Sequence, residues 1–483
     1  MNVKTLPLCA LIFALLCSLT ACQAGIIGGA DGPTSIFAAK GGDSDAIVIG
    51  PDGEVTSPSG ADAAEASESA EGAAELADGA APDDTEAAPD GAIQTSGPDG
   101  IPPTPDAPPA PLTLALLSGA WAEAVKAELP AFEQGNHAAC AVREMSRDEL
   151  YAALAQGADG VDLIMAHSSH LPEFRKLGVL ANLSALGYKP DDDIIPSVME
   201  ICADGNAVAL APWYANASVL LCNKKSLIAS GSSTDRLQHL ENMLAACKAA
   251  KQRGEIGFAY HESFEERITL DFLPILRSFD GAILDREGKP SVYTKKFQDA
   301  VNFFLELTAT GKAIPDGEFV SAINGGAALM GFVRSDWYPL SAKSAATYIP
   351  FPGAAKRGGE PHPAGTYAVW GFGVPANSQI PELSERLIEY LMNPNIQRNM
   401  LPSGLTPCRY SILQDPELQK DYPAYGKICA ALENSRSVPA VPEWPKMCDI
   451  LGEELWKVMA GRKKVTECLE DAQSRIETLL TAS

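Results

Sequence analysis

Basic residues are scarce in this sequence. Its 37 Lys and Arg stand against 62 Asp and Glu, so the formal net charge is -25. A protein that binds nucleic acid usually carries a basic stripe, and this charge balance argues against nucleic acid as a partner. Catalytic motifs are missing as well, because the chain contains no G-x-S-x-G, H-E-x-x-H or Walker loop. We therefore predict a protein that is not an enzyme and needs no cofactor.

Closely spaced cysteine pairs are also absent. None of the eleven cysteines belongs to a C-x-x-C motif, so the sequence indicates neither a zinc site nor a disulfide scaffold. Eight of them lie between Cys140 and Cys468, mostly within apolar or helical patterns, where cysteine acts as a small buried hydrophobe. We predict mostly free thiols, and whether Cys408 and Cys429 pair stays open.

One apolar run near the N-terminus is too short to span a bilayer comfortably. Lys4 precedes it, Leu6 to Leu19 form it, and Leu19-Thr20-Ala21-Cys22 follows. This arrangement resembles the lipobox of bacterial lipoproteins, in which the cysteine takes a diacylglycerol and becomes the new N-terminus. The resemblance implies a signal peptide at residues 1–21 and a lipid anchor on Cys22 at the outer face of the cell membrane. The alternative is an ordinary secretory signal with an incidental cysteine.

An acidic segment follows the anchor. Residues 41–110 contain sixteen Asp and Glu and no Lys or Arg, and so carry 16 of the 25 net negative charges. They are rich in Ala, Gly, Pro and Ser and cannot bury enough apolar surface to offset the entropy of ordering. We predict that residues 22–110 form a disordered tether, which as a flexible coil would reach on the order of 50 Å.

A glycine-rich segment stands near the start of this tether. Gly25 to Phe37 resembles a stretch in the membrane subunit of sodium-pumping decarboxylases, where the aspartate belongs to an ion pathway within a bundle of membrane helices. The sequence predicts no such bundle here. The glycines do not make a nucleotide-binding loop either, because no strand precedes them and no helix-forming run follows. The role of this segment stays open.

Strand and helix patterns alternate from about Pro111 onward. Leu112 to Leu117 is a short apolar strand pattern, and Trp121 to Phe132 has helical spacing. Ser146, with Glu149 three residues later, is typical of a capping box at a helix start. Val161 to Ala166 is nearly all apolar, as expected of a strand buried on both faces of a parallel sheet. This alternation predicts an α/β fold.

A series of short motifs resembles the extracellular solute-binding proteins of ABC sugar importers, the family that includes maltose-binding protein. The motifs occur in the family's order and cover nearly all of residues 111–483. They are 162–173, 177–183, Asp204-Gly205, 211–217, Cys222-Asn223-Lys224, 325–330, Trp337, 348–353, 371–375 and 404–409.

The resemblance implies a type II periplasmic-binding-protein-like fold, in which two discontinuous α/β lobes close over a ligand about a hinge. The chain would cross between lobes near Leu221, return near 367–372 and cross again after about Gly404. Lobe one would comprise about 111–221 and 368–405, and lobe two about 222–367 and 406–483. The helical patterns from Trp444 to Leu480 would pack in lobe two.

The chemistry of a sugar indicates which residues would line such a cleft. A pyranose has an apolar face of C–H groups and a belt of hydroxyls, so its site needs flat aromatic rings with donors and acceptors at their edges. Trp213 and Trp337 lie in stretches that match the family's cleft motifs, although a tryptophan in an apolar context can also be core. Ser118 is a further polar candidate, and each polar candidate could instead serve a turn or cap. The predicted ligand-binding residues are Trp121, Ser168, Trp213, Tyr214, Asn216, Asp336, Trp337, Trp370 and Arg409.

Three other constellations could suggest different chemistry. His167 and His170 could share a metal ion, but no Cys or carboxylate is spaced to complete the shell. Asp191-Asp192-Asp193 lacks the glycine and distal glutamate of a calcium loop. Glu262, Glu265 and Glu266 could be a glycosidase pair, but an exposed helical face explains them better. We predict no metal site.

Two functions of different class remain. The first is a monomeric transport protein that captures a sugar or oligosaccharide and delivers it to ABC permease subunits. The second is an extracellular sensor or adhesion module on the same fold, or a binder of a non-sugar solute. The identity, length and linkage of the ligand cannot be read from the sequence.

Overall fold

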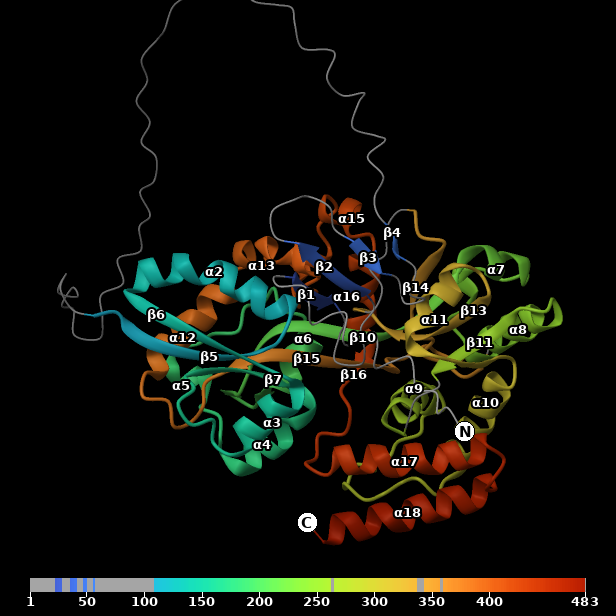
Figure 1. The fold of residues 1–483 in the computed structure, drawn as a ribbon. Coiled ribbons are helices and arrows are strands. Elements are labelled where there is room, and N and C mark those ends of the chain that lie inside the picture. Colours follow the sequence, from blue (N-terminus) through green and yellow to red (C-terminus); the bar gives the residue numbers. More distant parts are fainter. Residues whose placement is uncertain are drawn as a thin grey trace, which may run out of the picture. The chain divides into compact units, whose positions relative to one another are not determined.

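The structure is a computed structural model of the chain. It describes residues 22–27, 35–40, 47–49, 55–56, 108–261, 265–336, 343–356 and 359–482 (Figure 1). The chain divides into two compact units. One contains Met1–Gly25 with Ser35–Ala110, and the other contains Ile26–Thr34 with Pro111–Ser483.

Four short strands within residues 22–56 form a sheet of their own. They pair in the order β1 (Cys22–Ile27), β2 (Ser35–Lys40), β3 (Ile47–Ile49) and β4 (Val55–Thr56). The β-branched run of β3 suits a strand, and it pairs antiparallel with β2 and β4. Residues 57–107 and the Cys22 side chain lie outside what the structure describes, so the acidic tether and the lipid anchor stay predictions.

The second unit is built on a ten-stranded sheet. Its main path runs β12-β11-β13-β10-β15-β7-β5-β6, while β14 pairs with β10 and β16 pairs with β15. The strands are β5 (Ala110–Leu117), β6 (Ala138–Met145), β7 (Leu163–His167), β10 (Ala211–Asn223), β11 (Ile256–His261), β12 (Lys312–Ile314), β13 (Ala328–Arg334), β14 (Ala346–Pro350), β15 (Gly365–Gly373) and β16 (Ser435–Arg436). A separate two-stranded sheet joins β8 (Ala203–Asp204) to β9 (Ala207–Val208).

Strand β10 connects the two halves of this sheet. Its first part, Ala211 to Ala217, pairs antiparallel with β15, which in turn pairs with β7. From Ser218 onward it pairs with β13 and β14 instead. The change of partner therefore falls between Ala217 and Ser218, a few residues before the predicted crossing near Leu221. Figure 1 shows β10 and β15 running side by side between the halves.

Helices pack on both halves. Those on the β5–β7 half are α2 (Ala120–Asn136), α3 (Arg147–Ala155), α4 (Leu171–Leu177), α5 (Leu183–Leu186), α12 (Pro381–Leu391) and α13 (Pro394–Asn399). Those on the β11–β13 half are α7 (Lys224–Ala229), α8 (Leu240–Gln252), α9 (Glu265–Ser278), α10 (Lys295–Thr308), α11 (Asp316–Asn324), α17 (Trp444–Met459) and α18 (Val465–Thr481). The remaining helices are α6 (Pro196–Cys202), α14 (Tyr410–Leu413), α15 (Leu418–Asp421) and α16 (Tyr425–Glu433), with 3-10 turns η1 (Ser168–His170), η2 (Thr234–Arg236) and η3 (Leu401–Ser403).

Local sequence signals explain where these elements begin. The predicted capping box is confirmed: the Ser146 hydroxyl accepts from the backbone N–H of Glu149, and the Glu149 carboxylate accepts from the backbone N–H of Ser146. The predicted buried strand is β7, whose residues Leu163 to Ala166 are all buried. None of the helices within the described ranges is long and apolar enough to cross a membrane.

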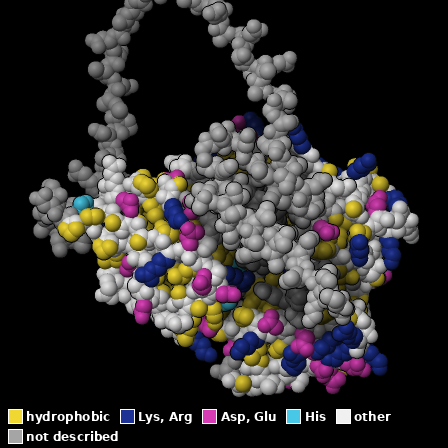
Figure 2. All heavy atoms as spheres, viewed as in Figure 1, with side chains coloured by type: hydrophobic (Ala, Val, Ile, Leu, Met, Phe, Trp, Pro, Cys, Tyr) yellow, Lys and Arg dark blue, Asp and Glu magenta, His cyan; other side chains and the backbone are white. Residues whose placement is uncertain are grey.

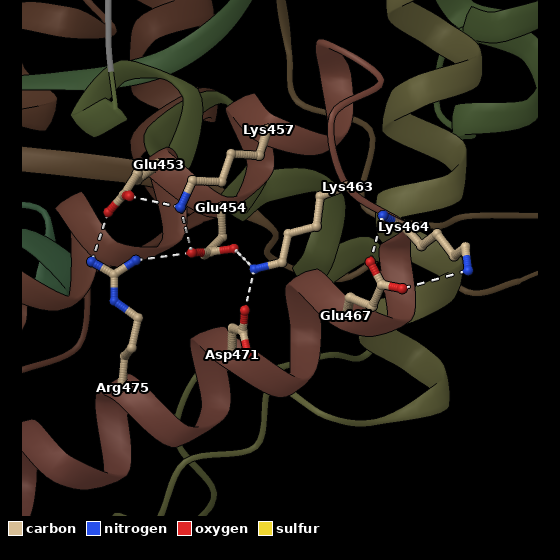
Figure 3. Close-up of polar contacts among 8 residues, drawn as sticks. All are labelled: Glu453, Glu454, Lys457, Lys463, Lys464, Glu467, Asp471 and Arg475. Carbon is tan, nitrogen blue, oxygen red and sulfur yellow. Dashed lines mark hydrogen bonds and ion pairs between the residues drawn. The ribbon is translucent and has the colours of Figure 1, made fainter.

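The C-terminal helices α17 and α18 pack against each other, and a network of ion pairs joins them. Leu451, Leu455 and Val458 are buried in the core of this half, as the helical pattern predicts. Beside them, the nearly fully buried Glu454 carboxylate accepts from Lys457 at 2.9 Å, from Arg475 at 2.9 Å and from Lys463 (Figure 3). Figure 2 shows the matching surface at the lower right, where Lys and Arg alternate with Asp and Glu. Three cations around one buried carboxylate fix the angle of the hairpin, a structural role.

A buried carboxyl group on α12 couples stability to pH. Glu385 is 5% exposed, and its Oε1 atom has no hydrogen-bond partner among the described residues. Burial, followed by the charge of Glu389, raises the pKa of Glu385 from 4.5 to about 7. The pKa is thus higher in the folded than in the unfolded chain. The protonated Glu385 carboxyl group therefore contributes fully to the stability of the folded chain below the unfolded pKa. This contribution is lost as the pH rises through about 7.

Replacing Glu385 by Gln should therefore flatten the pH dependence of unfolding. At pH values above the folded pKa, we expect the free energy of unfolding of the variant to exceed that of the parent protein by roughly 1–3 kcal/mol. Below the unfolded pKa, we expect little difference. Urea unfolding on both sides of this window measures the difference. Glu382→Gln, at an exposed position of the same helix, is the matched control and should leave the profile unchanged. Parallel profiles for parent and Glu385→Gln would show that Glu385 does not titrate in this window.

Candidate functional site

Three aromatic rings from distant parts of the sequence meet where the halves of the sheet join. Trp121 lies in the first turn of α2, Tyr214 on β10 and Trp370 on β15. The ring centroids of Trp121 and Tyr214 are 4.6 Å apart, and those of Trp121 and Trp370 are 6.1 Å apart. Trp121 is partly exposed, whereas Tyr214 and Trp370 are buried. These three residues are called the aromatic cluster below.

Strand register brings the cluster together. Tyr214 is the antiparallel partner of Trp370 across β10 and β15, so their side chains stand on the same face. On the other side of β15, Trp370 is paired with His167 at the end of β7. Helix α2 begins just after β5, at a turn where Gly119 has a φ of 104°, a conformation that L side chains rarely adopt. This turn places Trp121 over the strand ends.

Two histidines extend the cluster at its edge. The rings of His167 and Trp370 have centroids 5.0 Å apart, and His170 lies 4.5 Å from the ring of Tyr151. Together with Arg147 they line a small pocket beside Trp370, with space of about 10 Å³, room for roughly one water molecule. The Nδ1 atom of His170 is buried and has no hydrogen-bond partner among the described residues.

Both imidazoles are neutral at physiological pH. Burial, followed by the nearby charge of Arg147, lowers the pKa of His170 to about 4. The same two causes hold the pKa of His167 well below its usual range. Its Nδ1 atom is 2.7 Å from the hydroxyl of Ser169. The two imidazoles therefore offer polar atoms without a net charge, beside the cationic side chain of Arg147.

The Tyr214 hydroxyl is the second polar atom at the cluster without a partner. It is fully buried and forms no hydrogen bond of standard geometry with a described residue, although Asp336 and Asn216 lie close enough to shift its pKa. Burial, followed by the charge of Asp336, holds its pKa well above its usual range, so the group stays a neutral donor. Asp336 itself is bound by Arg334, at 3.2 Å from Nε and 3.1 Å from Nη2, which offsets its charge. Asn216, two residues along β10, is also buried and lies on the same face as Tyr214.

Ser168 positions the cluster. It is buried directly after β7, and its Oγ atom accepts from the backbone N–H of Val369 at 3.0 Å. Val369 precedes Trp370, so this bond fixes the height of the tryptophan relative to β7. We expect Ser168 to support the site and to contact a ligand less directly than predicted.

Trp213 requires a correction. The sequence predicts it as a ligand platform because its neighbours match a cleft motif. In the structure it is fully buried, and its ring packs on Phe372 with centroids 5.0 Å apart. Trp213 is the extra residue where the register between β10 and β15 shifts, so it has no partner of its own across the strands. Its Nε1 atom is buried and has no hydrogen-bond partner among the described residues. Trp213 is a core residue.

Arg409 is also placed differently from the prediction. It is 2% exposed, and its guanidinium is committed to protein groups. The Nε atom donates to Gln397 at 3.0 Å, Nη1 pairs with Asp191 and Asp193 at 2.5 and 3.3 Å, and Nη2 donates to the Met392 carbonyl. These bonds make Arg409 a structural tie between distant segments, which leaves no role in a ligand site. They also explain Asp191 and Asp193 without a calcium ion.

Trp337 lies outside the described residues, and so do Glu262 and the side chains of Glu265 and Glu266. Their roles stay predictions. Within the part of the chain that is described, no group of three or more His, Cys, Asp or Glu is arranged to hold a metal ion, and the eight cysteines from Cys140 to Cys468 are free thiols. The sequence did not single out Tyr151 or Arg147, and it weighed His170 only as a metal ligand. A polar residue just after a buried strand is the signal that could have found His170.

Two sheet halves that share crossing strands, with aromatic rings and neutral polar atoms at the junction, define a two-lobed binder of small molecules. Residues 131–425 match the family of bacterial extracellular solute-binding proteins. The chain belongs to that family, which confirms the resemblance seen in the sequence.

Individual relatives are distant in sequence. A probable amino-acid ABC transporter periplasmic-binding protein of Sinorhizobium fredii is 22% identical over 311 residues, which are 60% of this chain and 68% of that protein. Among solved structures, the cyclic alpha-maltosyl-1,6-maltose binding protein of Arthrobacter globiformis has a TM-score of 0.66 at 16% identity, covering 78% of this chain and 100% of that one. The sugar-binding protein MalE of Xanthomonas citri has a TM-score of 0.66 at 19% identity, with 77% and 98% covered. A ribitol complex from Agrobacterium radiobacter has a TM-score of 0.61 at 21% identity, with 77% and 98% covered. These likenesses confirm the predicted two-lobed fold.

Proposed function

We propose that this protein captures a neutral carbohydrate or polyol at the aromatic cluster and delivers it to an ABC importer. The observation that carries the proposal is the buried Tyr214 hydroxyl without a partner, set among the rings of Trp121 and Trp370. Aromatic rings suit the C–H face of a sugar, and a neutral hydroxyl suits its belt of oxygens.

The charge around the cluster favours a neutral ligand. His167 and His170 are uncharged at pH 7 because burial depresses their pKa values, and Arg334 offsets the charge of Asp336, while Arg147 adds a cation at the small pocket beside Trp370. An amino acid carries a carboxylate and an ammonium group, each of which would need an opposite charge when desolvated. The relative from Sinorhizobium fredii is named as an amino-acid binder, whereas three neighbouring structures are named for a cyclic maltoside, a sugar or ribitol. The residues of the aromatic cluster favour a carbohydrate or polyol ligand over an amino acid.

Placement at the membrane is part of the proposal. Lipid on Cys22 would hold the chain at the outer face of the cell membrane, and residues 22–110 would form a flexible tether between the anchor and the binding domain. Two acyl chains hold firmly where one binds only marginally. Delivery to permease subunits would then need no diffusion away from the cell.

A thermal-shift screen tests the ligand class. Neutral sugars and polyols should raise the melting temperature of the full chain, because a ligand that binds only the folded state stabilises it. Amino acids, peptides and metal ions should have no effect. A rise with amino acids alone would exclude the carbohydrate proposal.

Tyr214→Phe sharpens this test. Removing a buried hydroxyl that has no partner should leave the stability of the free protein unchanged or raise it by about 1 kcal/mol. It should lower the affinity for the best sugar from the screen roughly tenfold, because a ligand oxygen would lose its hydrogen-bond donor. Tyr410→Phe is the matched control, since that hydroxyl bonds Glu433 at an exposed site. Unchanged affinity in Tyr214→Phe would place the ligand elsewhere.

A further inference from the structure

A second opening lies on the other side of the crossing strands. It is a groove of about 640 Å³, large enough for a small organic molecule. Tyr367 lines it from β15, three residues before Trp370 of the aromatic cluster. Residues an odd number apart in a strand point to opposite faces, so groove and cluster lie on opposite sides of β15. Ser197 and Glu200 line the groove from α6, Leu273 and Arg277 from α9, and the rest comes from residues 281–288 and 435–440.

Arg277 at the C-terminal end of α9 is the unusual feature of this groove. Its Nη1 atom donates to the carbonyls of Gly365 at 2.7 Å and Arg436 at 3.0 Å, and its Nη2 atom donates to the carbonyl of Ser437. These oxygens satisfy hydrogen bonds but carry no net charge. Arg277 is partly exposed, and no ion pair joins it to a carboxylate within the described part of the chain.

Other charges make the groove a mixed but cationic surface. Arg286 and Arg436 line it and are exposed, and Arg436 adds to the positive charge beside Arg277. Glu200 is exposed at the opposite side, and Asp285 accepts from the backbone N–H groups of Glu287 and Lys289 in its own turn. Burial and then Arg436 lower the pKa of Arg277 to about 9, so the guanidinium remains charged at pH 7. Three arginines and two carboxylates therefore line the groove, and Arg277 is the least exposed of these five charged residues.

We propose that this groove is a second binding site, separate from the aromatic cluster, for a small molecule that carries carboxylate groups. Carboxylates match a guanidinium in shape and charge, and a ligand with several of them can reach Arg277, Arg286 and Arg436 together.

Citrate titrated into the full chain at low ionic strength, followed by calorimetry, tests the site. We expect saturable binding of one citrate. Arg286→Gln and Arg436→Gln should each weaken it roughly two- to fivefold, as expected for exposed charge pairs, and Glu200→Gln should strengthen it. Arg236→Gln, an exposed arginine outside the groove, is the matched control. No saturable binding, or equal affinity in all of these variants, would overturn the proposal.

A further variant separates the two sites. Trp121→Ala should leave citrate binding unchanged, so failure of the carbohydrate proposal and failure of this one are distinguishable. Loss of citrate binding in Trp121→Ala would move the anion to the aromatic cluster and refute the second site.

Discussion

Replacing Trp121 by Ala should abolish measurable sugar binding while the protein remains folded. Trp121 offers the partly exposed ring of the aromatic cluster, with Tyr214 and Trp370 packed behind it. A central aromatic anchor commonly carries a large share of binding energy, so we expect an affinity loss of at least 100-fold, about 3 kcal/mol. Isothermal titration with the best sugar from the screen measures this loss.

The control for this prediction is Trp456→Ala. Trp456 is 46% exposed on α17, where Arg462 lies over its ring. Its removal should change neither sugar affinity nor the fold. Because Trp121 is itself only partly buried, Trp121→Ala should lower the melting temperature of the free protein by only a few degrees. A folded Trp121→Ala protein that binds sugar as the parent does would show that the cluster is not the site.

Replacing Arg409 by Met should destabilise the protein strongly. The change would leave the buried Gln397 side chain and the Met392 carbonyl without their charged donor, and would release Asp191 and Asp193. Loss of a buried charged partner of this kind typically costs about 3–5 kcal/mol. Urea unfolding of the free protein, without any sugar, gives the value directly.

Arg398→Met is the matched comparison for Arg409. Arg398 pairs with Asp415 at 2.9 Å, but both side chains are partly exposed, so we expect a loss of only about 1 kcal/mol. Arg409→Lys should recover part of the stability through its charge but not the forked geometry. If Arg409→Met unfolded like the parent protein and lost only sugar affinity, Arg409 would be a ligand residue, as its motif suggests.

Much of the fold could be predicted from the sequence because its signals are local or periodic. The capping box at Ser146 and Glu149 needs only four residues, and an apolar run in the sequence predicts the buried strand β7. The order of short motifs then indicates the two-lobed family. The place where β10 changes its pairing partner, between Ala217 and Ser218, is harder to predict from the sequence. Nearly every residue of β10 is buried, so the apolar pattern shows no boundary there.

The site was harder to predict for the same reason. Trp213 and Tyr214 are adjacent and both fully buried, so sequence pattern cannot tell which one faces the cluster. Their orientation depends on pairing with β15, where the register shifts between Pro212 and Tyr214. The partners of Arg409 and the carbonyl ring around Arg277 come from distant segments that no motif connects. These residues had to be placed in three dimensions before their roles could be assigned.

The most direct test of the central claim is a crystal structure of the protein with the best sugar or polyol from the screen. We expect the ligand at the aromatic cluster, with an apolar face against Trp121 and an oxygen within hydrogen-bonding distance of the Tyr214 hydroxyl. A ligand bound elsewhere on the protein, with the rings of Trp121, Tyr214 and Trp370 in contact only with one another, would contradict it.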